Sequence, residues 1–380
     1  MKLFDVYPLY NVEPVRADNC SVWDKEGIEY LDLYGGHAVI SIGHAHPHYV
    51  NKLKNQLDHI GFYSNAVQNS LQQELADKLG KLSGCDAYEL FLCSSGAEAN
   101  ENALKLASFH NGKHRVVAFS NGFHGRTSAA VAATDNKAII APINAQQEVT
   151  ILPLGDLEAV EVALKKDDVC AVIIEPIQGV GGLDQAPTSF FQGLEKLCKQ
   201  YNTCLVLDEV QSGFGRSGKF FGFQHHGITP DIISMAKGMG NGFPIGGILI
   251  APHIASKYGL LGTTFGGNHL ACAACIAVLE VLEKEDLIEK SRILGEYFTA
   301  NATAIKGLKQ IKGRGLMIGL EFDFEVAQLR KELIYNEHIF TGGAKNKNLL
   351  RILPPLTVSS SQIDTFFTGV KKAIERLELV

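Results

Sequence analysis

Between about residue 70 and residue 255, segments that are apolar throughout alternate with segments that carry apolar residues at helical spacing. In chain order, these patterns predict a helix over 71–82, a strand over 89–93, a helix over 97–109, strands over 115–119 and 169–174, a helix over 190–201 and a strand over 204–207. A strand without polar residues needs cover on both of its faces. The alternation therefore predicts an α/β fold in which helices cover a mostly parallel sheet.

The two flanks of this region have a different character. Residues 20–23 and 28–33 alternate between apolar and polar side chains, as short half-buried strands do. The remaining predictions are helices over 48–59, to about 284 and over 286–304, a strand over 315–322, a helix from 324, a strand over 349–353 and a helix from 361. We expect an N-terminal arm (1–44) that is part of a small domain, a large domain (45–265) and the rest of a small α+β domain (266–380).

Charge and composition exclude several classes of protein. The net charge of −6 gives no electrostatic case for binding nucleic acid, and the apolar stretch Leu270–Leu279 is too short to span a membrane. The N-terminus lacks the apolar core of a signal peptide, so we expect a cytoplasmic protein whose eight cysteines are reduced. Cys272 and Cys275 form a C-x-x-C pattern within an apolar helix, where packing explains them better than redox chemistry or metal binding.

A lysine and an aspartate carry the clearest chemical signature. Lys237 precedes three glycines separated by single residues, and Asp208 follows an apolar strand 29 residues upstream (237 − 208). Burial lowers the pKa of a lysine and makes its amine a nucleophile. Asp208 either caps a helix or, when ionised, holds a proton on a pyridine nitrogen; Val210 would then press on the ring and Gln211 would reach its hydroxyl group. Pyridoxal 5′-phosphate (PLP) requires such a lysine and carboxylate.

Residues near other strand ends suit the same cofactor. Ser95, Gly96 and Ala97 precede a predicted helix, whose first N–H groups attract phosphate, although Ser95 also fits an ordinary helix cap. Phe123 can stack on a planar ring, with core packing as the alternative. Arg126 can bind a carboxylate through two parallel hydrogen bonds, with a surface ion pair as the alternative.

Two further motifs have plainer explanations. Residues 213–220 resemble a phosphate-binding P-loop, but Phe220 stands where that motif needs the hydroxyl group that binds Mg²⁺. His44, His46 and His48 suggest a metal site, yet the proline among them and the lack of nearby carboxylates favour a turn. No G-x-G-x-x-G that directly follows a predicted strand and opens a predicted helix is present, since the match at Gly213-Phe-Gly-Arg-Ser-Gly218 does neither. We therefore expect no nucleotide triphosphatase, no metal site and no dinucleotide-dependent dehydrogenase.

Nine motifs, in matching order and over nearly the whole length, resemble those of the class III PLP-dependent aminotransferases, most closely the acetylornithine/ornithine group. They are Tyr30-Leu-Asp-Leu33, Gly43-His-Ala-His-Pro47, Ser95-Gly-Ala-Glu-Ala-Asn100, Phe123-His-Gly-Arg-Thr127, Glu175-Pro-Ile-Gln-Gly179, Leu207-Asp-Glu-Val-Gln211, Ala236-Lys-Gly238, Thr264-Phe-Gly-Gly-Asn268 and Arg351-Ile-Leu-Pro-Pro355. The resemblance implies fold type I, PLP as the cofactor, and an obligate homodimer with active sites at the subunit interface.

The resemblance also implies roles for single residues. By this resemblance, Lys237 is the lysine that bonds covalently to the cofactor and moves protons. The residues that resemble other cofactor contacts are Asp208 at the pyridine nitrogen, Gln211 near the ring hydroxyl group, Gly96 and Ala97 at the phosphate, Phe123 stacked on the ring, and Thr264 at the phosphate of the other subunit.

Two arginines and one departure from the family pattern concern the substrates. Arg126 resembles the arginine that binds the α-carboxylate of a donor whose ω-amine reacts, and Arg351 the arginine that binds the α-carboxylate of 2-oxoglutarate or glutamate. Val180 stands where the family usually has a glutamate that pairs with the arginine at the position of Arg351. We expect Arg351 to be unmasked or to find another partner, and donor selectivity to differ. A second departure, His269 in place of proline, we expect to be structural.

The resemblance implies transfer of the δ-amine of N-acetylornithine to 2-oxoglutarate, giving N-acetylglutamate 5-semialdehyde and glutamate, a step of arginine biosynthesis. N-succinylornithine and ornithine stay open as donors, because sequence spacing does not size the pocket for the acyl group. A non-catalytic α/β binding protein is the remote alternative, and it would leave Lys237 without a role.

Overall fold

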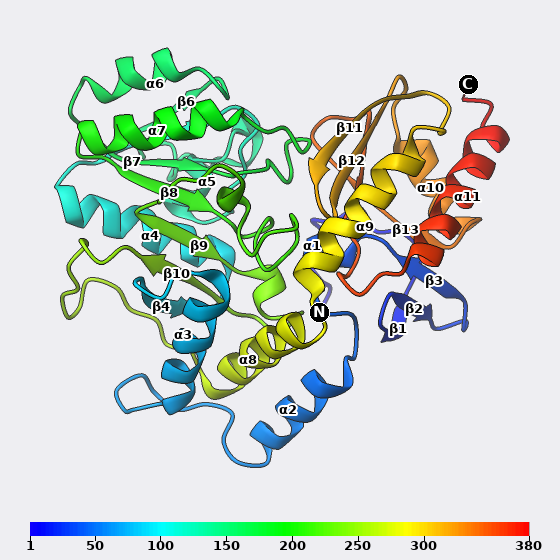
Figure 1. Ribbon diagram of the computed structural model, residues 1–380, viewed down its shortest axis with the longest axis horizontal. Helices are drawn as coiled ribbons and strands as arrows, with labels where there is room; N and C mark the ends of the chain where they lie inside the picture. The colour runs from blue at the N-terminus through cyan, green and yellow to red at the C-terminus, as the bar shows by residue number, and fades with distance from the viewer. Residues whose placement is uncertain (380) are drawn as a thin grey trace.

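The computed structural model describes residues 1–379 and forms three β-sheets in that range (Figure 1). The largest has seven strands in the order β4-β10-β9-β8-β7-β5-β6. These are β4 (Glu89–Cys93), β5 (Arg115–Phe119), β6 (Val149–Leu152), β7 (Val169–Ile174), β8 (Cys204–Asp208), β9 (Ile232–Met235) and β10 (Gly246–Ile250). The pairs from β9 to β6 are parallel, whereas β10 runs antiparallel to both β4 and β9. The predicted α/β fold with a mostly parallel sheet is confirmed.

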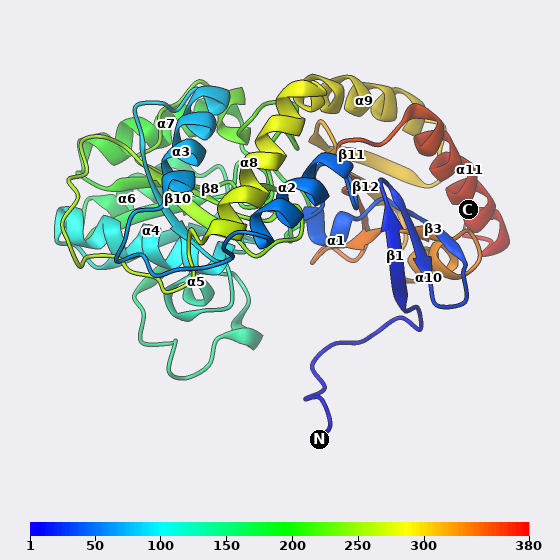
Figure 2. The ribbon, with the colours of Figure 1, turned by 90° about the horizontal axis from the view of Figure 1, so that it is seen from below.

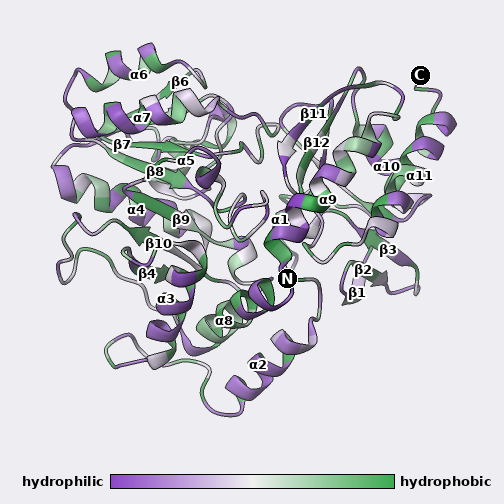
Figure 3. Cartoon of the chain, in the orientation of Figure 1, coloured by the Kyte–Doolittle hydropathy of each residue, from purple (hydrophilic) through white to green (hydrophobic). Residues whose placement is uncertain are grey.

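Helices cover both faces of this sheet (Figure 2). Helix α4 (Gly96–Asn111) lies on one face, where Cys204 and Val206 of β8 join its buried core. Leu205 and Leu207 point to the opposite core. That face is covered by α3 (Ser70–Ser83), α6 (Leu157–Leu164), α7 (Thr188–Gln200) and α8 (His269–Lys284). Because both faces of β8 are buried, its sequence has no polar alternation; the strands and α8 accordingly carry the hydrophobic colour in Figure 3.

The two smaller sheets lie beside the large one. One sheet has the order β1-β2-β3-β13 and the other β11-β12-β15-β14. Their strands are β1 (Pro14–Asp18), β2 (Ser21–Asp24), β3 (Glu29–Asp32), β11 (Leu308–Arg314), β12 (Met317–Phe322), β13 (Ile339–Phe340), β14 (Gly342–Gly343) and β15 (Leu349–Ile352). The helices here are α9 (Leu287–Ala302), α10 (Ala327–Tyr335) and α11 (Ser360–Arg376). Because β3 pairs with β13, we propose that the N-terminal arm belongs with the C-terminal part; the boundaries at 44/45 and 265/266 stay predictions.

Short helices and a few shifted boundaries complete the fold. The helices are α1 (Gly35–Ala38), α2 (Pro47–Leu57) and α5 (Ser128–Ala132). The strand expected from residue 315 begins at Met317, because Gly315 has a left-handed φ of +54° that a strand does not accommodate. The helix expected from residue 324 begins at Ala327. Seven strands were not predicted: β1, β6, β9, β10, β11, β13 and β14. Of these, β11 (Leu-Lys-Gln-Ile-Lys-Gly-Arg) is an edge strand with too few apolar residues to show a pattern.

The segment that resembles a P-loop joins the large sheet to the smaller ones. Arg216 is only 2% exposed, and its guanidinium donates hydrogen bonds to the carbonyl oxygens of Leu316 and Ile40, each at 3.3 Å, and to that of Pro354. Burial lowers the pKa of Arg216 to about 10, opposed by the charge of Asp32. The loop is therefore a structural joint.

Each of the three clustered histidines contacts its own carboxylate. His44 lies 2.8 Å from Asp32, His46 lies 2.9 Å from Glu285, and His48 lies 2.7 Å from Glu280. The expectation that carboxylates were lacking was wrong, because these partners are distant in sequence. Over residues 1–379, no group of three or more His, Cys, Asp or Glu side chains is arranged to hold a metal ion.

All eight cysteines are buried free thiols. Cys272 and Cys275 are buried residues of α8 and belong to the hydrophobic core, as the packing explanation predicted. Within the described residues, no helix combines the length and the apolar character needed to cross a membrane.

Candidate active site

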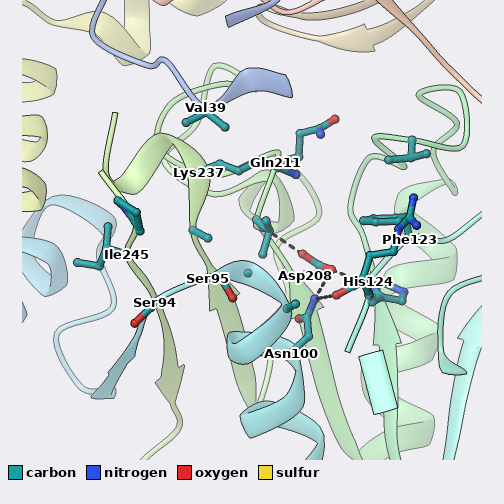
Figure 4. Close-up of a pocket in the computed structure, with 18 of the residues that line it drawn as sticks. Val39, Ser94, Ser95, Asn100, Phe123, His124, Asp208, Gln211, Lys237 and Ile245 are labelled. Carbon is teal, nitrogen blue, oxygen red and sulfur yellow. Dashed lines mark hydrogen bonds and ion pairs between the residues drawn. The ribbon is translucent and has the colours of Figure 1, made fainter. Parts of the chain in front are cut away.

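A cavity of about 380 Å³ opens where the parallel strands of the large sheet end (Figure 4). Nine of the eleven residues singled out from the sequence line it together: Ser95, Gly96, Ala97, Phe123, Arg126, Asp208, Val210, Gln211 and Lys237. They come from the ends of β4, β5, β8 and β9 and from the loops that follow. Ligands of open α/β sheets bind at this edge, because the loops and helix N-termini converge there.

Asp208, the last residue of β8, is fixed by three hydrogen bonds. Its Oδ2 accepts from Asn100 Nδ2 at 2.8 Å and contacts His124 Nδ1 at 2.7 Å, and its Oδ1 accepts from the backbone N–H of Val210 at 3.1 Å. The side chain is 4% exposed. A buried carboxylate needs such partners, because leaving water without them costs several kcal/mol (about 1–3 for each lost hydrogen bond, more for a charge).

The groups that hold Asp208 are themselves held. Asn100 also donates to the carbonyl oxygen of His124 at 2.7 Å, and its Oδ1 accepts from the Ser234 hydroxyl at 2.6 Å. Burial lowers the pKa of His124, but the hydrogen bond and charge of Asp208, with the charge of Glu175, outweigh it and raise that pKa above its ordinary value. His124, which also lines the cavity, therefore carries a positive charge next to Asp208 more readily than an ordinary histidine does.

Lys237 follows β9, from which a single residue, Ala236, separates it. Its backbone φ is +49°, a left-handed conformation that costs a non-glycine residue free energy and that proteins retain at functional sites. Among residues 1–379, no side chain or carbonyl group forms a hydrogen bond with its amine. Burial lowers the pKa of Lys237, opposed by the charges of Asp208 and Glu175 and assisted by that of Arg351. A larger share of this lysine is therefore a free amine near neutral pH than of an ordinary one.

The N-terminus of α4 faces the cavity and can receive an anion. Ser95 is the N-cap, and its hydroxyl accepts a hydrogen bond from the N–H of Glu98 at 3.2 Å, so the plain helix-cap explanation holds for this side chain. The N–H groups of Gly96 and Ala97 follow, and the first amides of a helix have no acceptor within it. A Cβ on Gly96 would lie 2.7 Å from Val210 Cγ1. Only glycine lets these two elements approach so closely.

Glu175, after β7, is a second buried carboxylate in the cavity wall. It accepts hydrogen bonds from the N–H groups of Phe123 at 2.9 Å and Gly179 at 2.8 Å, and so fixes the loop that carries the Phe123 ring. Burial raises the pKa of Glu175 to about 7, opposed mainly by the charge of His124. Near neutral pH this group therefore exchanges a proton more readily than an ordinary glutamate does.

Arg351 lies behind Gln211 rather than in the cavity wall. It is 3% exposed, and its guanidinium donates to the carbonyl oxygens of Gly343 at 2.6 Å and Gly179 at 2.9 Å, and to Gln211 Oε1 at 3.4 Å. No carboxylate among residues 1–379 forms an ion pair with Arg351, whereas Val180 lines the cavity. The sequence left open whether Arg351 is unmasked or has another partner. The structure gives it three neutral acceptors in place of a carboxylate.

Of the last two candidate residues, Arg126 lines the cavity and Thr264 does not. Arg126 is exposed at the cavity and makes no hydrogen bond or ion pair with any other residue in the range 1–379, so its guanidinium is available to a ligand. Thr264 lies on an exposed loop outside this cavity. Its predicted role in the other subunit stays a prediction.

Sequence reasoning missed several residues of this cavity. Asn100 and His124 lay inside recognised motifs but received no role, although Asn100 falls one helical turn after Gly96 on the same face of α4. Four other lining residues had no sequence signal, because chain folding alone brings them here: Val39, Phe243, Pro244 and Ile245.

Comparison with known proteins identifies the class. The family model for aminotransferase class-III matches residues 6–374. The chain belongs to this family and is an aminotransferase.

The most informative relatives share one name. The acetylornithine aminotransferase of Bacillus subtilis (strain 168) is 38% identical over 379 residues, covering 98% of this chain and 97% of the relative. The acetylornithine aminotransferase of Archaeoglobus fulgidus is 37% identical over 365 residues, covering 95% of each.

Solved structures agree on the fold. The ornithine aminotransferase of Toxoplasma gondii, crystallised with partial occupancy of PLP at its active site, superposes with a TM-score of 0.89 at 27% identity, covering 97% of this chain and 92% of that one. An S-selective transaminase from Arthrobacter sp. has a TM-score of 0.91 at 23% identity, covering 100% and 96%, and shows the same fold.

Asp208 and Glu209 are adjacent buried carboxylates with different tasks, and they provide a matched pair of variants. Asp208→Asn removes the charge that faces the cavity, so aminotransferase activity should fall by about 10²- to 10⁴-fold with the fold retained. Glu209 instead accepts from the Ser212 hydroxyl and from the N–H groups of Gly222 and Phe223. Glu209→Gln should therefore keep activity within about threefold and lower the free energy of unfolding by about 2 kcal/mol.

Steady-state rates and urea unfolding followed by circular dichroism measure both effects. Equal loss of activity in the two variants would contradict the distinction.

Proposed function

We propose that the cavity binds PLP and that Lys237 is its covalent attachment point. One observation carries this proposal: a lysine amine without a hydrogen-bond partner among residues 1–379 shares a cavity with a carboxylate fixed by three hydrogen bonds. The set of groups fits the cofactor, because the N-terminus of α4 suits a phosphate, Asp208 a protonated pyridine nitrogen, and Phe123 and Val210 the faces of a ring. The PLP found in the Toxoplasma gondii enzyme supports this fit.

When bound, PLP supplies a place for the electrons released as a C–H bond of the substrate breaks. Each step by the protein then follows from its own residues. Lys237 would take a proton from the amine-bearing carbon of the substrate and give it back, because its lowered pKa lets its amine act as both base and acid. Asp208, held by His124 and Asn100, would keep a proton on the ring nitrogen of the cofactor. Gln211, in the cavity wall, would reach the ring hydroxyl group, and Arg351 donates to Gln211 Oε1 at 3.4 Å.

We propose N-acetylornithine as the amino donor and 2-oxoglutarate as the acceptor, giving N-acetylglutamate 5-semialdehyde and glutamate in arginine biosynthesis in the cytoplasm. The names of the relatives at 37–38% identity support this donor. Arg126, free at the cavity, would bind the α-carboxylate and leave the δ-amine near Lys237. Arg351, whose partners are neutral, would bind the α-carboxylate of the acceptor when that group displaces Gln211 from it.

We further propose a homodimer in which Thr264 reaches the phosphate of the other subunit. Next to Thr264, the ring of Phe265 is 62% exposed and lies 5.4 Å from that of Phe62, which is 44% exposed. Aromatic side chains gathered on a surface favour an interface there.

A comparison of donors tests the proposed substrate. Purified enzyme with PLP and 2-oxoglutarate receives N-acetylornithine, N-succinylornithine or ornithine, and the glutamate formed is measured. We expect the highest kcat/KM for N-acetylornithine. A higher value for N-succinylornithine or ornithine would replace the donor, and no glutamate from any of them would overturn the proposed activity.

Val180→Glu tests the consequence of leaving Arg351 without a carboxylate. The new carboxylate follows Gly179, whose carbonyl oxygen Arg351 already contacts. It should compete with the carboxylate of 2-oxoglutarate and raise the KM for that acceptor by about tenfold, with a smaller effect on the ω-amine half-reaction. Val162→Glu is the control. Val162 is 57% exposed on α6, so this variant adds the same charge away from the cavity. Unchanged kinetics of both half-reactions in Val180→Glu would rule out masking.

A further inference from the structure

An ion pair near the active-site cavity joins a loop of a small sheet to a loop of the large sheet. The amine of Lys345, between β14 and β15, lies 3.0 Å from Asp135 Oδ2 and donates to the Asp135 carbonyl oxygen at 3.1 Å. Asp135 follows α5, which contacts α4 on the large sheet. The Lys345 and Asp135 side chains are 48% and 30% exposed, and a pair so exposed adds little to global stability. Its place in the fold matters more, because both residues also bind the backbone of the cavity wall.

Asp135 holds the loop after β5 (120–127), which carries Phe123. Its Oδ2 accepts a hydrogen bond from the N–H of Asn121 at 2.8 Å, and its own N–H donates to the carbonyl oxygen of Gly122 at 2.9 Å. Asn121 has a left-handed φ of +64°, which asparagine tolerates better than most residues but which still needs support. The N–H of Asn121 and the charge of Lys345, opposed by burial, lower the pKa of Asp135. The carboxylate is therefore ionised near neutral pH.

Lys345 holds a second loop, the one after β7 (175–187). Its backbone N–H donates to the carbonyl oxygen of Val180 at 2.9 Å. The next residue packs against the first loop, since a Cβ on Gly181 would lie only 2.6 Å from the carbonyl oxygen of Asn121. Phe123 and Val180 both line the cavity. The ion pair therefore closes a ring of contacts that joins two walls of the site.

Buried contacts secure the same loops on their inner side. Glu175 accepts from the N–H groups of Phe123 and Gly179, and the carbonyl oxygen of Gly179 accepts from Arg351 at 2.9 Å. Arg351 also donates to the carbonyl oxygen of Gly343 at 2.6 Å, in the segment that leads to the ion pair. The loops after β5 and β7 are thus held by buried hydrogen bonds inside and by an exposed ion pair outside. The exposed contact is the weaker, so the walls separate there first.

We propose that Asp135 and Lys345 are positioning residues for the transamination. Their ion pair holds the loop after β5 against the loop after β7 and so fixes the walls between which the acceptor carboxylate meets Arg351. Neither residue lines the cavity, so both act through the loops that they bind. This inference rests on the proposed acceptor, 2-oxoglutarate. When the pair is broken, the walls loosen and the acceptor binds less tightly, whereas the groups that move the proton lie on other elements and keep their rate.

The test removes the charges and keeps the backbone contacts. In the holoenzyme, Lys345→Met still donates its N–H to Val180, and Asp135→Asn still offers an oxygen to the N–H of Asn121. In either variant the KM for 2-oxoglutarate should rise about twofold to fivefold, the factor that an exposed ion pair supplies, with kcat within about twofold of the wild type. The double variant should be no worse than the single ones, because the interaction is lost only once. Added sodium chloride should raise this KM more in the wild type than in Lys345→Met, since salt screens only a pair that exists.

Lys312→Met is the matched control. Lys312 of β11 also ties a small sheet to the loop after β7, through Asp184 at 2.9 Å, but neither of these residues lines the cavity. This variant should keep the wild-type KM whatever its thermal midpoint. An unchanged KM in Lys345→Met and Asp135→Asn, additive losses in the double variant, or an equal rise in Lys312→Met would overturn the inference. If the wild-type enzyme makes no glutamate from 2-oxoglutarate, the proposed acceptor fails before any variant is compared.

Discussion

The site depends on one buried carboxylate that the fold keeps in a fixed place. Asp208 ends β8 at the edge where five parallel strands finish, and His124, Asn100 and the N–H of Val210 hold both of its oxygens. An unsupported carboxylate at such depth would turn toward water or take up a proton. The supporting groups come from α4 and from the loop after β5, so the layers of the large sheet must be assembled before this charge is stable. Lys237 is then brought opposite it by the next strand of the sheet.

Backbone strain and close contacts gather around the same cavity. Lys237 and Asn121 both have left-handed φ values, and a Cβ on Gly96 would overlap Val210. These features lower the stability of the fold, and the packed cores on the two faces of the sheet offset that loss. The joint at Arg216 ties the large sheet to β12 and to the segment after β15 through carbonyl groups, and Arg351 enters from that side to contact Gln211. Parts of the chain far apart in sequence therefore meet at one chemical site.

The sequence predicted the sheet well because β7 and β8 are buried on both faces and read as unbroken apolar runs. It also found Lys237, Asp208 and Gly96, whose residue types are unusual for their local context. It missed β11, where polar residues at a sheet edge leave no period, and it missed the carboxylate partners of His44, His46 and His48, which fold in from other segments. The ion pair of Asp135 with Lys345 was not predicted either, since its two residues lie far apart in sequence, in loops that have no hydrophobic period.

The central claim is that the amine of Lys237 bonds covalently to the cofactor while Asp208 faces it. Purified holoenzyme treated with borohydride and digested with trypsin tests this directly, because reduction makes the bond permanent. The claim predicts that the peptide containing Lys237, and no other lysine peptide, gains the mass of a reduced pyridoxyl phosphate group. An unmodified Lys237 peptide, or the added mass on a different lysine, would contradict it.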